Sequence, residues 1–197
     1  MKKKLILLFL VLLTLFTITG CINKKENKNT SNSNTSSSEI KSDDNKVVIY
    51  FSATGTTKSI AEKIAKESKS DIIEIIPKEK YKSDDLNYNS DCRANREQND
   101  PKARPEIEND INISNYDTIY LGYPIWWGTN PKIILTLLDK YDFTGKTIIP
   151  FCTSGSTGIS GSVRDLRNYN SNLTIKDGQR FSLSDSDDTI KKFVNNF

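Results

Sequence analysis

The sequence predicts an α/β domain built on a doubly wound parallel β-sheet with helices on both faces. Short apolar runs rich in β-branched and aromatic residues, such as 47–51, are typical of strands buried on both faces. Stretches with apolar residues at helical spacing follow these runs, and the two kinds of segment alternate along the chain. Such alternation is typical of parallel strands joined by right-handed crossovers.

The first half of this domain contains three predicted strands and one helix. A strand over 47–51 precedes a helix over 59–66, whose apolar stripe consists of Ile60, Ala61, Ile64 and Ala65. A second strand over 72–76 ends at Pro77, and a third covers 118–122.

The second half begins with a helix that has Asn130 as its N-cap and Pro131 at its first helical position. Its apolar stripe consists of Ile134, Leu137, Leu138 and Tyr141. A fourth strand is predicted over 146–151. We expect Pro150 to mark its end, because proline cannot donate to a central ladder. A helix follows over 160–169.

The tail completes the pattern with a strand and a helix. The strand covers 173–183 and is interrupted at 177–178, where the sequence is Asp-Gly. The terminal helix covers 185–195, and its inward residues are Ile190, Phe193 and Val194.

The composition of the 197 residues excludes several kinds of chemistry. The absence of histidine excludes Ser-His-Asp units and imidazole metal sites, and three cysteines are too few for a four-thiolate cluster. We therefore expect no metal site and no catalytic acid or base, and redox chemistry would need an organic cofactor. The net charge of +3 is accounted for by Lys2, Lys3 and Lys4, so no basic surface for nucleic acid is expected.

Residues 1–20 have the features of an export signal, with lysines before an apolar run that is too short to span a membrane. The sequence ending at Cys21 resembles a bacterial lipobox, which implies cleavage before Cys21 and acylation of its sulfur. The alternative is an uncleaved N-terminal anchor. Both place the domain at the extracytoplasmic face of the bacterial cell membrane. Residues 21–45 are polar and nearly free of large apolar side chains, which predicts a disordered tether before a folded domain over 46–197.

The loop after the first strand combines four hydroxyls with a glycine at the start of a helix. Its candidate residues are Ser52, Thr54, Gly55, Thr56 and Thr57. Backbone amides and the helix dipole favour an anion at this place, and the loop lacks the Gly-Lys-Ser/Thr ending of a nucleoside triphosphate loop. A phosphate monoester is therefore the favoured ligand, although simple helix capping by Ser and Thr is the alternative.

The loops after the third and fourth strands lie at the same edge of the sheet as the loop after the first strand. The first of them holds Pro124, Ile125, Trp126, Trp127 and Gly128, and adjacent indoles provide flat surfaces for a planar ring. A hydrophobic plug over the sheet end is the alternative. The other holds Cys152, Thr153, Ser154, Gly155 and Gly158, whose backbone amides suit a heteroaromatic edge unless the loop is an ordinary connection.

These three loops in this order resemble the flavodoxin family, specifically its branch with two tryptophans in the second loop and an arginine-rich segment after the second strand. Here that segment is 91–105, which contains Arg-Glu-Gln-Asn-Asp. The resemblance covers 46–197. It implies a five-stranded sheet in the order 2-1-3-4-5 and one noncovalent FMN. The first loop would hold the FMN phosphate, the second would contact the isoalloxazine, and the third would contact its pyrimidine side.

The domain departs from acidic electron carriers of this family in its charge. From Lys46 onward, 21 cations balance 21 anions, so electrostatic docking to a basic redox partner is less favoured. The third loop carries no acidic residue. We therefore expect a less negative potential for the second one-electron reduction of the flavin than acidic carriers have.

The crossover over 79–115 has few aliphatic residues and is expected to be a long ordered loop or a short helix that folds toward the flavin. Its candidate lid or substrate residues are Arg93, Arg96, Arg104, Tyr81 and Tyr88. An arginine could meet an anionic substrate or the reduced flavin, but a solvated salt-bridge face is the favoured alternative. A disulfide between Cys92 and Cys152 is possible outside the cell, and an unpaired Cys152 is favoured over it.

The sequence thus predicts a lipid-anchored flavoprotein in electron transfer. It would act as a carrier for a redox partner protein or as a small reductase of a quinone or nicotinamide substrate. The alternative is a flavodoxin-fold module that binds a phosphorylated ligand or a protein without turnover.

Overall fold

The computed structural model describes residues 45–197. The strands are β1 (Lys46–Tyr50), β2 (Asp71–Glu74), β3 (Thr118–Pro124), β4 (Thr147–Thr153), β5 (Thr174–Ile175) and β6 (Gln179–Phe181). The helices are α1 (Thr56–Ser68), α2 (Arg93–Asn99), α3 (Lys132–Lys140), α4 (Ser160–Tyr169) and α5 (Asp187–Asn195), with the short 3-10 helix η1 (Ser83–Leu86). None of the helices in this part of the chain is long and apolar enough to cross a membrane. The predicted signal peptide, the predicted lipidation at Cys21 and all of the predicted tether except Asn45 lie outside the described residues.

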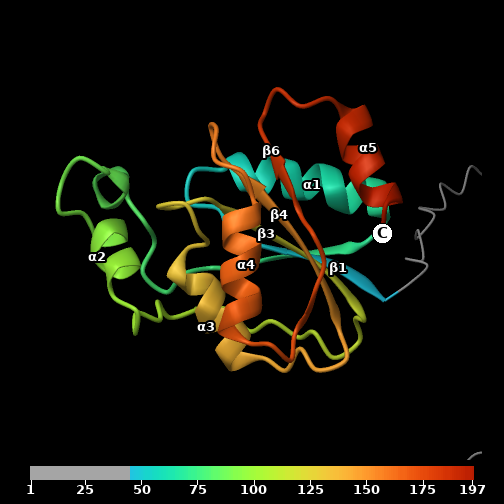
Figure 1. Cartoon of the computed structure of the whole chain (residues 1–197), viewed down its shortest axis with the longest axis horizontal. Coiled ribbons are helices and arrows are strands. Elements are labelled where there is room, and N and C mark those ends of the chain that lie inside the picture. The colour runs from blue at the N-terminus through green and yellow to red at the C-terminus, as the bar shows by residue number, and fades with distance from the viewer. Residues whose placement is uncertain (1–44) are drawn as a thin grey trace, which may run out of the picture. The chain divides into compact units, whose positions relative to one another are not determined.

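The strands form one parallel sheet in the order β2-β1-β3-β4-β5, and β6 pairs with β4 further along the same edge (Figure 1). Together β5 and β6 are the fifth strand, interrupted where the sequence predicted. The doubly wound α/β fold and the strand order 2-1-3-4-5 are therefore confirmed.

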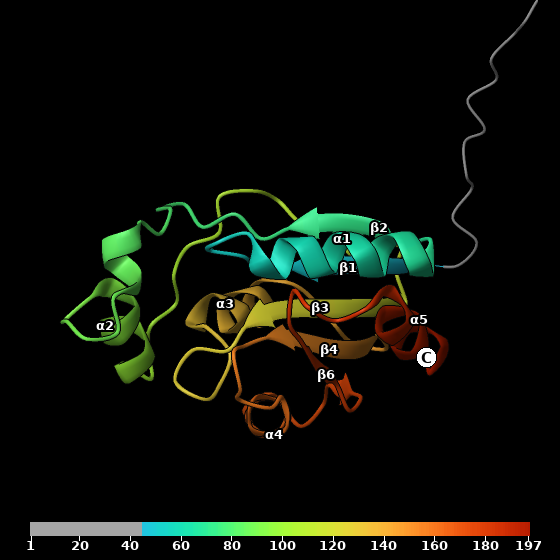
Figure 2. The ribbon, with the colours of Figure 1, turned by 90° about the horizontal axis from the view of Figure 1, so that it is seen from above.

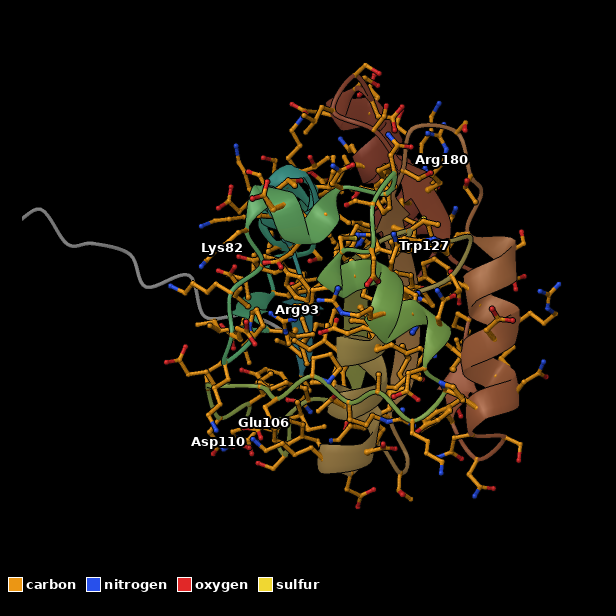
Figure 3. All side chains as sticks on the ribbon, turned by 90° about the vertical axis from the view of Figure 1, so that its left-hand side faces the viewer. Lys82, Arg93, Glu106, Asp110, Trp127 and Arg180 are labelled. Atoms are coloured by element: carbon orange, nitrogen blue, oxygen red, sulfur yellow. The ribbon has the colours of Figure 1, made fainter. Side chains whose placement is uncertain are left out.

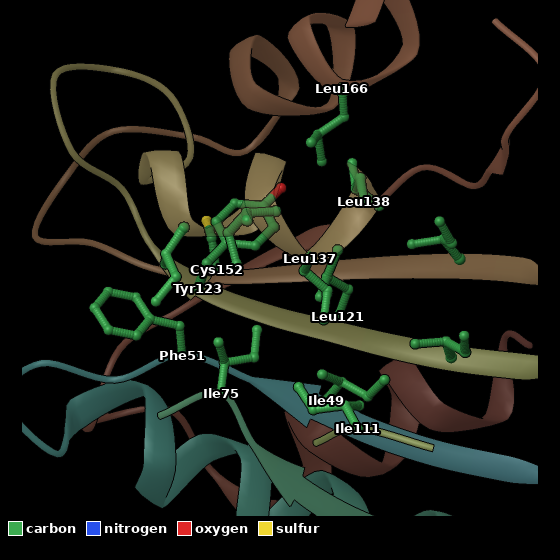
Figure 4. Close-up of a cluster of buried hydrophobic side chains, with 14 of the residues drawn as sticks. Ile49, Phe51, Ile75, Ile111, Leu121, Tyr123, Leu137, Leu138, Cys152 and Leu166 are labelled. Atoms are coloured by element: carbon green, nitrogen blue, oxygen red, sulfur yellow. The ribbon is translucent and has the colours of Figure 1, made fainter. Parts of the chain in front are cut away.

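Two buried clusters cover the two faces of this sheet. Along β1, Val47 and Ile49 face the cluster that contains α3 and α4, whereas Val48 and Tyr50 face the cluster that contains α1 and α5. This alternation follows from the two-residue period of a strand. Figure 4 shows part of the first cluster, in which side chains from the central strands meet those of α3 and α4.

The start of α3 differs from the expectation by one residue. Pro131 is the N-cap, with φ −60° and ψ 148°, so the helix begins at Lys132 and the predicted N-cap Asn130 lies one residue earlier. The side chain of Asn130 makes no capping hydrogen bond. Its amide instead donates to the adjacent Pro131 carbonyl oxygen at 3.3 Å. The first helical amide, that of Lys132, donates to Oε1 of Gln98 on α2 at 3.1 Å, so the cap comes from a distant segment.

Pro150 does not end β4, contrary to the expectation from sequence, because the strand continues to Thr153. Two residues before Pro150, the carbonyl oxygen of Ile148 accepts a hydrogen bond from the Lys176 amide on the side of the fifth strand. Backbone groups alternate in direction along a strand, so the missing amide of Pro150 faces the same side. There the fifth strand is interrupted between Ile175 and Gln179, so no ladder hydrogen bond is lost.

The long crossover between β2 and β3 is ordered, as expected, and contains only η1 and α2 as helices. Figure 2 shows α2 beyond the arrowheads of the strands, at their carboxyl ends. Three isoleucines anchor the crossover in the core: Ile107, Ile111 and Ile113. The segment is thus placed over the edge of the sheet where the three candidate loops lie.

Candidate functional site

A cavity of about 520 Å³, here called the main cavity, opens at the carboxyl ends of the central strands. The three candidate loops each contribute three of their predicted residues to its lining: Thr54, Thr56, Thr57, Pro124, Ile125, Trp126, Thr153, Ser154 and Gly155. The structure therefore brings these residues together around one space. The remaining predicted residues are not among the lining residues: Ser52, Gly55, Trp127, Gly128, Cys152 and Gly158.

The loop after β1 is shaped by Gly55, which has φ +87° and serves as the N-cap of α1. Only glycine adopts this left-handed conformation readily. The hydroxyl of Ser52 accepts the Gly55 amide at 3.1 Å, which closes the loop. No side chain caps α1, so the amides of its first turn, beginning at Thr56, have neither a capping side chain nor an intrahelical acceptor. Such a turn is a natural anion site.

Thr57 connects the first loop to the third. Its hydroxyl lies 2.8 Å from that of Thr153, and both residues are buried. A hydrogen bond between two buried hydroxyls fixes the distance between the loops. Thr57 is therefore placed to position the anion site, while Thr54 and Thr56 offer hydroxyls at the cavity surface.

The second loop ends in a tight hairpin over 126–129, here called the Trp hairpin. The amide of Trp126 donates to the Thr129 carbonyl oxygen at 2.9 Å, and the Thr129 amide donates back at 3.1 Å. The two central residues, Trp127 and Gly128, have φ of 49° and 79°. Positive φ at both central positions is the geometry of a type I′ turn, which normally contains Asn-Gly or Gly-Gly.

The two indoles of this hairpin have different environments. Trp126 is 3% exposed, lines the cavity, and packs edge-on against Phe51 and Tyr81. Trp127 is 43% exposed, with its ring centroid 4.6 Å from that of Tyr88. Figure 3 views this end of the molecule and labels Trp127. Trp126 thus plugs the sheet end and forms a cavity wall, whereas Trp127 offers an open aromatic surface.

The strain at Trp127 leads to a stability prediction. Asparagine tolerates positive φ better than alanine does, so Trp127→Asn is expected to exceed Trp127→Ala in free energy of unfolding by about 1 kcal/mol. Both variants lose the contact with Tyr88, which makes them a matched pair. Urea unfolding measures the difference. Equal stabilities, or a more stable alanine variant, would contradict the turn geometry.

The third loop is shorter than predicted, because Cys152 and Thr153 belong to β4. The Cys152 side chain is fully buried in the core, and burial raises the pKa of its thiol to about 12. The carbonyl oxygen of Ser154 accepts a hydrogen bond of 3.0 Å from Arg180 on β6, and its hydroxyl donates to the Thr157 carbonyl oxygen. Strand β6 therefore helps to order this loop.

Cys92 and Cys152 are both buried and are not paired with each other. Because the folded pKa of Cys152 is about 12, against an ordinary value of about 9, the thiol stays protonated at pH 8. We expect the native protein to resist alkylation of Cys152 at pH 8, and the guanidinium-unfolded protein to react fully. Peptide mass spectrometry after iodoacetamide treatment measures both. The contribution of the buried, protonated Cys152 thiol to the free energy of unfolding is present below pH 9 and is lost as the pH rises toward 12.

The three arginines of the crossover lie in ion pairs and do not line the cavity. Arg93 Nε donates to Glu97 at 2.6 Å, Arg96 Nη1 lies 3.5 Å from Asp91, and Arg104 Nε donates to Asp139 at 2.7 Å. These pairs favour the salt-bridge alternative over a substrate contact. Arg93 also lies 4.1 Å above the ring of Tyr81, whose hydroxyl donates to Glu97.

Tyr81 lines a second cavity of about 280 Å³, together with Ser52. Burial and the hydrogen bond to Glu97 raise the pKa of Tyr81. Tyr88, by contrast, lines the main cavity. The crossover therefore contributes one tyrosine to the wall of the main cavity and one to its support.

Sequence reasoning missed several residues that line the main cavity. They come from the crossover and from the segment at the end of the fifth strand: Leu86, Phe181, Ser182 and Leu183. The loop after the fifth strand ends at the same edge of the sheet as the others, and that position was the signal available. Among the residues that the structure describes, no charged side chain lines the cavity. Within residues 45–197, no group of three His, Cys, Asp or Glu side chains could hold a metal ion.

Residues 45–197 match the family model described as Flavodoxin. A crystal structure of a candidate flavoprotein from Bacteroides eggerthii is 38% identical and covers 78% of this chain and 98% of its own, with a TM-score of 0.74. Another from Bacteroides uniformis is 37% identical, with coverages of 77% and 98% and a TM-score of 0.75. A flavoprotein from Lactobacillus acidophilus, solved in complex with FMN, is 27% identical, with coverages of 77% and 99% and a TM-score of 0.61. No curated protein matches the chain.

Proposed function

The chain belongs to the flavodoxin family, and we propose that it binds one noncovalent FMN in the main cavity and transfers electrons through it. The observation that carries the proposal is the cavity itself, which joins an uncapped helix N-terminus to an aromatic wall. When bound, FMN supplies one-electron and two-electron transfer chemistry, and the protein supplies orientation and electrostatics.

The donor set at α1 fits the FMN phosphate. The first-turn amides point to the loop, the positive end of the helix dipole favours a dianion, and Thr54 and Thr56 add hydroxyls. The first turn contains no acidic residue that would repel a phosphate. The phosphate group of FMN would therefore find hydrogen-bond donors at the start of the helix and would not need a cation.

The remaining walls fit the flavin ring. Ile125, Trp126, Tyr88 and Leu183 provide apolar surface, and the loop at Ser154 provides polar backbone groups. A planar ring that buries apolar surface against these residues is stabilised by the hydrophobic effect and by aromatic contacts. The cavity thus combines a polar end for the phosphate with apolar walls for the ring.

The mouth of the cavity favours a small uncharged planar substrate over a charged partner protein. Leu183 and Tyr88, which line the cavity, are 62% and 54% exposed, and Trp127 beside Tyr88 is 43% exposed. Large apolar side chains gathered at one opening are typical of a binding site. Together with the absence of charged lining residues, this supports the reductase of a quinone ahead of an acidic carrier.

Visible spectroscopy and steady-state assays test the proposed function. We expect the purified protein to be yellow, or to become so with added FMN, and to release FMN on denaturation. Oxidation of NADH or NADPH with a benzoquinone acceptor would identify a reductase, whereas inertness without a separate reductase would identify a carrier. A protein that stays colourless in excess FMN would instead support the module that binds a phosphorylated ligand or a protein without turnover.

The neutral lining also predicts the redox behaviour. A reduced flavin carries negative charge, which a nearby carboxylate would destabilise. We expect the second one-electron reduction to have a less negative potential than in acidic flavodoxins, and Ser154→Asp to make it more negative. Potentiometric titration measures both variants. An equally extreme potential in the wild type would contradict this expectation.

We also propose that the protein is a lipoprotein anchored at the extracytoplasmic face of the bacterial membrane. The support is the lysine-rich and apolar sequence before Cys21, followed by a polar stretch. Expression of wild type and Cys21→Ser, followed by membrane fractionation and intact mass measurement, tests it. The wild type should lose residues 1–20, gain lipid mass and sediment with membranes, whereas Cys21→Ser should keep residues 1–20 and gain no lipid mass.

A further inference from the structure

The Arg-Glu-Gln-Asn-Asp sequence on α2 has no role in the lining of the main cavity, yet its glutamine contacts the Trp hairpin. We propose that Gln98 is a positioning residue that holds the Trp hairpin and the start of α3 in the geometry that binds the flavin. This inference rests on the proposed function, since the hairpin is taken to contact FMN.

The side-chain amide of Gln98 makes three hydrogen bonds around this hairpin. Its Nε2 donates to the carbonyl oxygens of Trp126 at 3.2 Å and Asn130 at 3.3 Å. Its Oε1 accepts the amide of Lys132 at 3.1 Å. A single side chain thus binds the entrance of the hairpin, its exit and the first turn of α3.

The backbone of the hairpin has few hydrogen bonds of its own, although the ring of Trp126 packs in the core. It is one bridge long, and its turn contains a tryptophan at positive φ, an unfavourable conformation for an aromatic residue. Pro131 has no amide to donate, and no side chain at the N-cap of α3 can accept the Lys132 amide. Gln98 therefore supplies a cap and a clamp that the local sequence lacks.

The neighbouring residue of α2, Glu97, is linked to the same tryptophan through Tyr81. Glu97 accepts from the hydroxyl of Tyr81, whose ring lies 5.1 Å from that of Trp126. Arg93, labelled in Figure 3, holds Glu97 and covers Tyr81. Gln98 thus holds the backbone of Trp126, and Glu97, through Tyr81, supports its ring.

The polarity of Gln98 matters as much as its length. A carboxylate at this position would face the carbonyl oxygens of Trp126 and Asn130 and could donate to neither. Those two oxygens would disfavour the charged form of the new carboxyl and raise its pKa, whereas the Lys132 amide, which would still donate to one carboxylate oxygen, acts in the opposite direction. When protonated, the carboxyl could again donate one hydrogen bond.

Two variants and one control test the proposal. Gln98→Met keeps the length of the side chain and removes its polar groups. Gln98→Glu replaces the NH2 donor by an oxygen. The control, Lys102→Met, alters an exposed side chain on the same crossover. We expect Gln98→Met to weaken FMN binding about tenfold, which is about 1.4 kcal/mol. Gln98→Glu should bind weakly at pH 7.5 and recover part of the wild-type affinity as pH falls toward 4.5. At each pH the FMN affinity of the variant is divided by that of wild type, which removes the effect of the titration of FMN itself. Lys102→Met should match wild type.

Acrylamide quenching of tryptophan fluorescence in the flavin-free protein provides a second readout. Both tryptophans of the chain lie in the hairpin, so Gln98→Met should increase quenching even where no flavin binds. If the wild type fails to bind FMN, the proposed function fails, and quenching alone decides the positioning role. Wild-type quenching in Gln98→Met would overturn the proposal, as would FMN affinity in both variants equal to that of wild type at all pH values.

Discussion

Thr56→Asp is expected to weaken FMN binding at least a hundredfold while leaving riboflavin binding close to that of wild type. Thr56 is the first residue of α1 and lines the cavity at the proposed phosphate position. A carboxylate about 4 Å from a phosphate costs ~4 kcal/mol at an effective dielectric constant of 20, and riboflavin has no phosphate to repel. The free energy of unfolding of the flavin-free protein should not fall, because an aspartate in the first turn interacts favourably with the helix dipole.

Thr56→Asn is the matched control, because it has the shape of aspartate without the charge. We expect it to retain most of the FMN affinity. Isothermal titration with FMN and riboflavin measures all three proteins. If aspartate and asparagine weaken both flavins equally, the phosphate does not lie at the N-terminus of α1.

Gly178→Ala should destabilise the domain by about 2–3 kcal/mol, which lowers Tm by several degrees. A Cβ at this position would lie 2.3 Å from the carbonyl oxygen of Pro150 and 2.6 Å from Ile159 Cδ1. The first contact is with backbone, which cannot move without separating the fifth strand from β4. The interruption between β5 and β6 that accommodates Pro150 therefore depends on a residue without a side chain.

Gly158→Ala is the control for this prediction, since a Cβ there would meet no heavy atom within 4 Å. Its Tm should stay within about a degree of that of wild type. Urea unfolding and thermal scans of both variants measure the difference. A Gly178→Ala protein as stable as Gly158→Ala would show that the close approach to Pro150 is not rigid.

The elements that sequence predicted well are those with a regular period. The continuous apolar run predicted as a strand over 47–51 forms one at Lys46–Tyr50, one residue earlier, and the amphipathic stripe over 160–169 forms a helix with those bounds. The errors concern partners far apart in sequence. The cap of α3 comes from Gln98, and the place of Pro150 depends on a break in the neighbouring strand. A local pattern contains no information about either partner.

The cavity could be predicted from sequence only in part. Glycines and hydroxyls after three strands indicated one edge of a parallel sheet, and nine of the residues named there line the cavity. The side chain of Cys152 faces the core instead, because β4 runs two residues further than its apolar run suggested. The contribution of Leu183 has no motif and follows only from the three-dimensional position of the last crossover.

A crystal structure of the protein grown with FMN tests the central claim most directly. The account predicts a phosphate within hydrogen-bonding distance of the Thr56 and Thr57 amides and of the Thr54 hydroxyl, with the flavin ring against the Trp hairpin. FMN bound elsewhere, or bound with its phosphate away from α1, would contradict it.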